Sequence, residues 1–150
     1  MSTYTQILYQ VVFGSKKCTP FLTRNNQDEL FRYVAGILIN KKCFPYIVGG
    51  HENHIHMIFC LYRTVTLSDL VRDVKKASED MMLGNKGKFL RFPGWQVGYG
   101  AFTYSIGSKE RLIGYVENQA EHHRRITFME ELIHFLKEFG VEYNEKYLFV

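Results

Sequence analysis

The sequence has few of the residues that build disulfide-bonded or membrane-spanning proteins. Its three cysteines, Cys18, Cys43 and Cys60, are odd in number and lack a C-x-x-C spacing, which fits a reducing cytosol. No apolar run approaches the roughly 20 residues that a membrane helix needs, and the first residues lack the pattern of a secretory signal. We therefore expect a cytoplasmic protein with no membrane partner.

The chain also lacks repeats, linkers and low-complexity segments. It has 150 residues, of which 46% are hydrophobic and 23% charged, a composition typical of folded globular proteins rather than disordered ones. We therefore expect one domain spanning residues 1–150. The formal net charge of +4 permits a polyanionic partner without requiring one.

Hydrophobic periodicity and turn residues predict an α+β protein. We expect strands over residues 4–13, 43–48, 54–61 and 99–106, and helices over residues 23 or 25 to 42, 66–84, 108–125 and 127–140. A turn that begins at Gly49–Gly50 would join the second and third strands as an antiparallel hairpin. This order, β-α-β-β-α-β followed by helices, predicts a ferredoxin-like split βαβ fold. Its antiparallel sheet would have four to five strands, with additional C-terminal helices.

Two histidines, His54 and His56, stand two residues apart at the start of the third strand. Alternate residues of a strand share a face, so both imidazoles would point away from the buried side of the sheet, which takes Ile55, Met57, Phe59 and Leu61. Neutral imidazole is a common metal ligand, and a same-face pair on a strand is suited to hold an ion. The alternative is a pair of half-exposed polar residues on a hydrated sheet face.

A second group of polar residues lies in the helix predicted over residues 108–125. Tyr115 and Gln119 are four residues apart and therefore share a helix face, at the edge of an apolar arc formed by Leu112, Ile113, Val116 and Ala120. At that edge a side chain can border a cleft. The alternative is that Tyr115 packs at the margin of the core while Gln119 bonds nearby.

Basic residues occur in several loops and helices that could converge on one nucleic-acid-binding face: Lys16, Lys17, Arg63, Arg72, Lys75, Lys76, Lys86, Lys88 and Arg91. Phe89, Phe92 and Trp95 interleave with the last of these, as expected where bases stack on aromatic rings beside a phosphate track. The alternative is a solvated helix beside an aromatic loop that fills the core.

The other histidines give weaker indications. A turn position for His51 favours solvent exposure, although His51 could also support the histidine pair. His122 and His123 follow Gln119 by one turn, where a phosphate contact and a solvated helix end are both open. His134 receives no role.

Together the His-x-His strand and the later Tyr-x-x-x-Gln helix resemble the HUH endonucleases. The resemblance is strongest to the single-tyrosine transposases of bacterial insertion sequences (IS200-like and REP-associated tyrosine transposases). It is carried by the Gly49–His56 run, Leu70–Lys75, Trp95–Phe102, the Tyr115–His123 segment and Thr127–Glu131.

This resemblance implies an enzyme in which Tyr115 attacks single-stranded DNA to give a 5′-phosphotyrosine intermediate. It implies that His54, His56 and Gln119 hold a divalent ion, Mg²⁺ or Mn²⁺, of which Mn²⁺ suits imidazole better. It also implies DNA with hairpin ends as partner, a homodimer, no organic cofactor, and action at the bacterial nucleoid.

Two alternatives remain open from the sequence. One is a non-catalytic single-stranded nucleic-acid-binding protein on the open face of a ferredoxin-like sheet, although residues 4–10 lack the aromatic signature of RNA-recognition modules. The other is an HUH nuclease that serves replication initiation or repeat-element processing.

Overall fold

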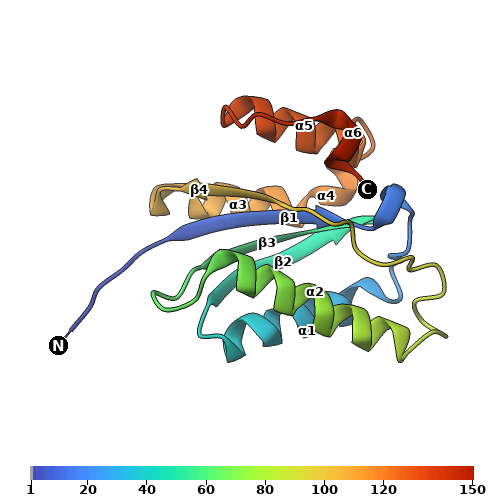
Figure 1. Cartoon of the computed structure of the whole chain (residues 1–150), viewed down its shortest axis with the longest axis horizontal. Helices are drawn as coiled ribbons and strands as arrows, with labels where there is room; N and C mark the ends of the chain where they lie inside the picture. The colour runs from blue at the N-terminus through green and yellow to red at the C-terminus, as the bar shows by residue number, and fades with distance from the viewer. Residues whose placement is uncertain (1) are drawn as a thin grey trace.

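The computed structural model describes residues 2–150, which form three layers with the sheet in the middle (Figure 1). Helices α1 (Gln27–Asn40) and α2 (Leu67–Leu83) cover one face of the sheet. The other face is covered by α3 (Lys109–Glu117), α4 (Gln119–His122) and α5 (Phe128–Glu138), with the short α6 (Glu145–Leu148) beside α5. In residues 2–150 no helix combines the length and hydrophobicity needed to cross a membrane.

The sheet confirms the predicted split βαβ arrangement. Its four strands are β1 (Leu8–Gly14), β2 (Phe44–His51), β3 (His54–Cys60) and β4 (Gly100–Tyr104), in the order β2-β3-β1-β4. All three neighbouring pairs are antiparallel. The histidine strand β3 therefore lies at the centre, paired on both sides.

Both faces of the sheet are buried, so the hydrated-face interpretation of the histidine pair is wrong. On the α1–α2 side, Ile55, Met57 and Phe59 of β3 pack in the larger core. On the other side, Val12 packs with Phe102 and with α5, while Leu8 and Ile58 pack against α3. A sheet covered in this way offers no open platform on which bases could stack.

The hairpin between β2 and β3 turns later than predicted. Strand β2 continues through Gly49 and Gly50 to His51, and the turn falls at Glu52–Asn53, where Glu52 has a φ of 46°. The two glycines are needed for close approach instead. A methyl group at Gly49 would lie 2.7 Å from Val116 Cγ1, and one at Gly50 would lie 2.1 Å from the His54 carbonyl oxygen. Gly49 thus lets α3 pack directly on β2.

The helix predicted over residues 108–125 is divided into α3 and α4. The break falls at Asn118, whose backbone angles are φ −96° and ψ 19°. Asparagine is a weak helix former that commonly occurs at helix ends. The last long helix begins as predicted, since Thr127 and Glu130 form a complete capping box. The short helix α6 was not expected.

The loop after α2 fills the core with its aromatic residues, so the base-stacking expectation for this loop is wrong. Phe89, Phe92 and Trp95 are 3%, 9% and 5% exposed. Trp95 packs edge-on against Phe13 at 4.8 Å between ring centroids and donates a 3.0 Å hydrogen bond to Ser78 Oγ. Three rings buried against α2 and β1 cannot offer their faces to bases.

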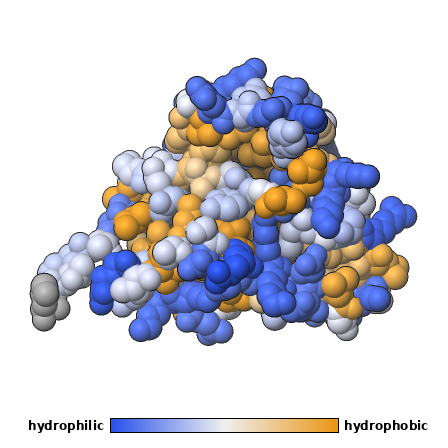
Figure 2. Space-filling model, in the orientation of Figure 1, coloured by the Kyte–Doolittle hydropathy of each residue, from blue (hydrophilic) through white to orange (hydrophobic). Residues whose placement is uncertain are grey.

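Apolar side chains also gather in a hollow under the hydrophilic outer surface of α5 (Figure 2). Phe102 and Tyr104 of β4 both contact the ring of Phe139, at centroid distances of 4.8 and 5.3 Å. These contacts hold the end of α5 over β4. The helix is thereby fixed above the face of the sheet that carries the two histidines.

Candidate active site

The histidine pair points as predicted toward the face covered by α3, α4 and α5. His54 and His56 are both fully buried, opposite Gly14 and Val12 of β1. Their rings lie 5.1 Å apart between centroids. A rigid central strand thus presents two imidazoles to one enclosed space.

Hydrogen bonds to Nδ1 orient both rings. His54 Nδ1 lies 2.9 Å from Asn53 Oδ1, and Asn53 Nδ2 donates to the Cys18 carbonyl at 3.0 Å. Because a carbonyl only accepts, the Asn53 amide must turn its oxygen to His54, which fixes the hydrogen on Nδ1. His56 Nδ1 lies 2.9 Å from Gln10 Oε1. Nε2 of His54 is left as a lone pair facing the site, the arrangement typical of metal-ligating histidines.

Tyr115 and Gln119 are brought to this pair by α3 and α4 of the same chain. Gln119 is 1% exposed and its Oε1 lies 2.8 Å from His54 Nε2. The ring of Tyr115 stands 5.8 Å from that of His56, and its hydroxyl lies 3.0 Å from His122 Nε2. The structure therefore gathers all four residues that the sequence proposed for catalysis and metal binding.

Glu131 of α5 lies at the centre of the group, although sequence reasoning did not select it. Its Oε1 lies 3.1 Å from His56 Nε2 and 3.3 Å from His54 Nε2, while its Oε2 accepts hydrogen bonds from the Tyr115 hydroxyl and from Gln119 Nε2. The carboxylate is 1% exposed. One signal was available: an acid stands within the apolar stripe of an amphipathic helix.

The structure also decides between the interpretations of the remaining histidines. His123 is not at a solvated helix end: its side chain is 5% exposed, and its Nε2 lies 2.9 Å from Gln119 Oε1 and 3.3 Å from Glu131 Oε1. His122 is partly exposed beside Tyr115. His51 is also partly exposed and stacks on His123 at 5.8 Å between ring centroids. His134 is exposed on α5.

Burial and the central carboxylate shift the pKa values of the site in opposite directions. Burial lowers the pKa of His54 to about 4, although the adjacent Glu131 carboxylate acts against this shift. Burial also raises the pKa of Glu131, but the adjacent imidazoles of His56, His123 and His54 outweigh burial and hold that pKa well below its usual range. Glu131 is therefore an anion inside the protein.

The Tyr115 hydroxyl is held in its protonated form by the same surroundings. Burial is the largest cause that raises the pKa of Tyr115, and the adjacent negative charge of Glu131 raises it further. A cavity of about 200 Å³ opens beside this hydroxyl, lined by Tyr104, Arg111, His122 and Phe135 among others. The cavity offers room for a ligand next to Tyr115.

The predicted DNA-contacting cations lie in several places. Arg72, Lys75 and Lys76 belong to α2, on the sheet face opposite the histidine pair. The ammonium of Lys75 donates to the carbonyls of residues 96, 97 and 98 at 2.7, 3.2 and 2.8 Å, and burial lowers its pKa to about 8. All three of its donors are thus engaged within the protein.

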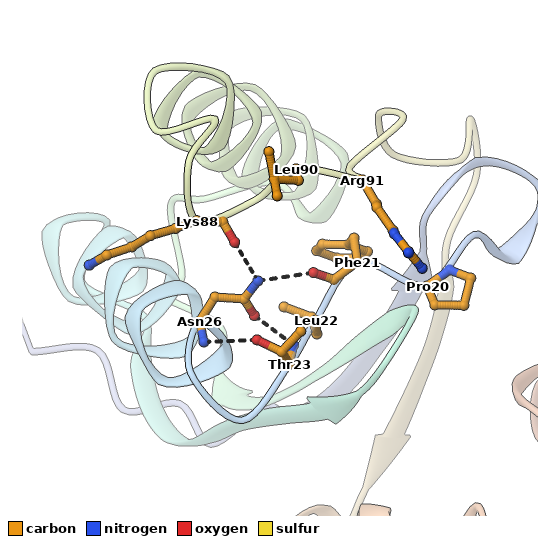
Figure 3. Close-up of a pocket in the computed structure, with 8 residues that line it drawn as sticks. All are labelled: Pro20, Phe21, Leu22, Thr23, Asn26, Lys88, Leu90 and Arg91. Atoms are coloured by element: carbon orange, nitrogen blue, oxygen red, sulfur yellow. Dashed lines mark hydrogen bonds between the residues drawn. The ribbon is translucent and has the colours of Figure 1, made fainter.

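Two other predicted cations, Lys88 and Arg91, line a cavity of about 410 Å³ (Figure 3). Its base is fixed by Asn26, whose Nδ2 donates to the carbonyls of Phe21 and Lys88 at 3.0 and 2.8 Å. Lys16 and Lys17 lie in a short 3-10 turn after β1, Arg63 follows β3, and Lys86 precedes Lys88 in the loop after α2. Contact of these cations with DNA stays a prediction.

The side chains at the histidine face fit a divalent metal ion. His54, His123 and Glu131 offer ligand atoms that all lie within 4.8 Å of one another, and His56 and Gln119 point to the same place. Imidazole nitrogens with carboxylate and amide oxygens form a donor set that first-row transition metals accept.

Comparison with known families gives one match that covers most of the chain. The pattern of the family described as "Transposase IS200 like" matches residues 3–119. That range includes the histidine strand, Tyr115 and Gln119, and it ends before His123 and Glu131. No curated protein sequence matches the chain.

Two solved structures share the fold. A protein of Deinococcus radiodurans R1, assigned as a transposase, superposes with a TM-score of 0.62 at 18% identity, covering 79% of this chain and 95% of that one. A REP-associated tyrosine transposase bound to a REP hairpin superposes with a TM-score of 0.56 at 16% identity, covering 82% of this chain and 74% of that one. At these identities the likeness concerns the fold.

Proposed function

Because the chain belongs to the family of IS200-like transposases, enzymes that act on DNA, we propose that it cleaves and rejoins single-stranded DNA through Tyr115. One observation carries the proposal. The Tyr115 hydroxyl and the His54–His56 pair meet on the two oxygens of one buried carboxylate, that of Glu131. A nucleophile and a metal-ligand pair within one enclosed site are the components of phosphodiester transfer.

The proposed reaction begins with attack of the Tyr115 oxygen on a phosphorus of the DNA backbone. The O–P bond to Tyr115 forms as the bond to the 3′ oxygen breaks, which leaves a 5′-phosphotyrosine and a free 3′-hydroxyl. The phenolic proton leaves toward Glu131 Oε2, which already accepts the Tyr115 hydrogen bond. In the reverse direction, a 3′-hydroxyl of another strand attacks the phosphotyrosine and restores a phosphodiester without any external energy source.

A divalent ion held by His54, His56 and Gln119 would polarise the scissile phosphate and offset the charge that develops in the transition state. The protein supplies the orientation. Asn53 and Gln10 hold the two imidazoles by their Nδ1 atoms, and the β3 backbone keeps them fixed. The dry surroundings of His54 keep its Nε2 unprotonated, as a ligand must be.

For the DNA we propose a single strand with hairpin ends, acted on in the bacterial cytoplasm. The hairpin in the REP-associated neighbour supports this choice. The cavity lined by Lys88 and Arg91, with the apolar side chains of Phe21 and Leu90, is suited to a base beside a phosphate. Because Tyr115 lies beside His56 of its own chain, we expect one copy to hold a complete site. The predicted homodimer would join two such sites.

Covalent trapping tests the proposal. We expect the protein with a hairpin-bearing single strand and Mn²⁺ to form a covalent adduct that resists denaturing electrophoresis. Tyr115→Phe should abolish the adduct, whereas Tyr147→Phe, at an exposed position, should leave it unchanged. His56→Ala should stop cleavage while much of the DNA affinity remains.

The same assay separates the alternatives. DNA binding with no adduct under varied ends and metals would refute the enzyme and favour a binding protein. An adduct that hydrolyses and never rejoins to a second 3′-hydroxyl would favour a processing nuclease over a transposase.

A further inference from the structure

Five side-chain atoms from β3, α4, α5 and the turn after α4 point into the buried site. They are Nε2 of His54, His56 and His123, with Oε1 of Gln119 and Glu131. The sequence selected three of these residues. His123 and Glu131 lie beyond the family-matched residues 3–119.

Hydrogen bonds elsewhere on His54, His123 and Gln119 leave no proton on the atoms that these three side chains turn toward the site. His123 Nδ1 lies 2.8 Å from the Ile126 carbonyl, which can only accept, so the ring hydrogen is on Nδ1 and Nε2 is a lone pair. The same reasoning holds for His54, whose Nδ1 faces Asn53 Oδ1. Gln119 Nε2 donates to Glu131 Oε2 at 3.1 Å, so the amide must turn its oxygen toward the histidines.

Lone pairs of His54 and His123 and the oxygens of Gln119 and Glu131 thus face one another in a dry pocket, and His56 Nε2 lies 3.1 Å from Glu131 Oε1. Lone pairs at contact distance repel, so the group needs positive charge among them. A metal cation would offset this repulsion.

The separations agree with one coordination shell. Metal bonds to histidine and carboxylate ligands are roughly 2.0–2.2 Å long, so neighbouring ligands at right angles stand roughly 2.8–3.1 Å apart on the same bond lengths. The contacts among the five atoms are 2.8 Å and 3.3 Å from His54, 3.1 Å from His56, and 2.9 Å and 3.3 Å from His123. These contacts, and the 4.8 Å within which the ligand atoms of His54, His123 and Glu131 all lie, are close to the spacing of ligands of one ion.

We propose that His123 and Glu131 complete a five-ligand, transition-metal-selective site with His54, His56 and Gln119. This inference rests on the proposed function, since it concerns the same ion. Three imidazole nitrogens favour Mn²⁺ and its heavier neighbours over Mg²⁺, which prefers oxygen ligands and retains its water. The other oxygen of Glu131 holds the Tyr115 hydroxyl, so this carboxylate links the ion to the nucleophile.

Metal binding by the purified full-length chain tests the inference without any DNA or activity. We would titrate Mn²⁺ and, separately, Mg²⁺ into the protein and into its Glu131→Gln and His123→Asn variants, and measure Kd by calorimetry. Electron spin echo spectroscopy of bound Mn²⁺ would count the coupled imidazole nitrogens. Glu138→Gln and His134→Asn are matched controls, since both are exposed on α5, and circular dichroism would check that every variant is folded.

We expect Mn²⁺ to bind the native protein at least tenfold more tightly than Mg²⁺, with three coupled imidazoles. Each of Glu131→Gln and His123→Asn should weaken Mn²⁺ binding by at least about tenfold. His123→Asn should lower the imidazole count to two, and the controls should bind as the native protein does.

Two outcomes would overturn the inference in different ways. If both variants bind Mn²⁺ within twofold of the native protein while His56→Ala does not, the ion uses only the three residues of the proposed function, which then stands alone. If His56→Ala also binds normally, the metal lies elsewhere and the metal part of the proposed function fails with the inference. The Tyr115 adduct assay remains an independent test of strand transfer.

Discussion

The contact between Gly49 and α3 gives a prediction that links packing to catalysis. Carbon atoms in ordinary contact are about 3.5–4.0 Å apart, and a methyl group at Gly49 would lie 2.7 Å from Val116 Cγ1. Gly49→Ala therefore forces an overlap of roughly 1 Å. A valine in a helix has essentially one side-chain rotamer, so Val116 cannot rotate away. We expect α3 to shift away from β2.

The shift should affect both stability and chemistry. Overpacking of this kind costs about 1–3 kcal/mol, which urea denaturation would measure as a lower midpoint. Because α3 carries Tyr115, a displacement of about 1 Å should slow formation of the covalent DNA adduct by about 100-fold. Gly114→Ala is the matched control. It lies in α3 with no atom within 4 Å of the added methyl, so it should not lower stability.

A second substitution tests the cause. Val116→Ala removes the clashing methyl group. The double variant, with Gly49→Ala and Val116→Ala together, should therefore lose about 0.5–3 kcal/mol less stability than the two single losses add up to. Strict additivity of the two changes, or a cost of Gly49→Ala below about 0.5 kcal/mol, would refute the view that Gly49 sets the position of α3.

Three further predictions concern the buried groups. Without metal, His54 has a pKa of about 4 in the folded protein and of about 6.5 in the unfolded protein. At a pH between these two pKa values, only the unfolded state takes up the proton. The free energy of unfolding should therefore fall by about 3 kcal/mol as the pH drops from 7 to 4, and an equal fall in His54→Gln would contradict this. Mn²⁺ at 100 times its Kd should add about 2.7 kcal/mol of stability, seen as a higher Tm that EDTA reverses; a Tm indifferent to Mn²⁺ would argue against a site in the folded state. Trp95→Phe should cost about 1–3 kcal/mol by leaving the Ser78 hydroxyl without its donor while adduct formation persists; unchanged stability with weakened DNA binding would instead support base stacking.

Much of the fold followed from short-range patterns in the sequence. The alternation of β3 placed His54 and His56 on one face and Ile55 and Met57 on the other, because the period of a strand is a property of its backbone. The capping box fixed the start of α5 because its two residues, Thr127 and Glu130, are near neighbours in the sequence. The strand and helix order was enough for the split βαβ fold.

The parts that were missed or left open depend on contacts between distant segments. Burial of Trp95 depends on Ser78 and Phe13, and the break at Asn118 separates α3 from α4 where one continuous helix was expected. Nothing local to residues 86–95 distinguishes an aromatic loop that fills a core from one that binds bases. Only the packed structure makes that choice.

The residues of the candidate site fall into the same two groups: those that local patterns predicted, and those that only contacts between distant segments bring together. The sequence by itself determined which side chains of β3 and of the tyrosine helix share a face, since strand and helix periods are local. The tertiary structure decided that Glu131 meets His56, 75 residues away along the chain, and that His123 turns inward. Those encounters require α5 to fold over the sheet, and burial of its apolar stripe against Val12 and Phe102, a long-range hydrophobic contact, is what brings it there.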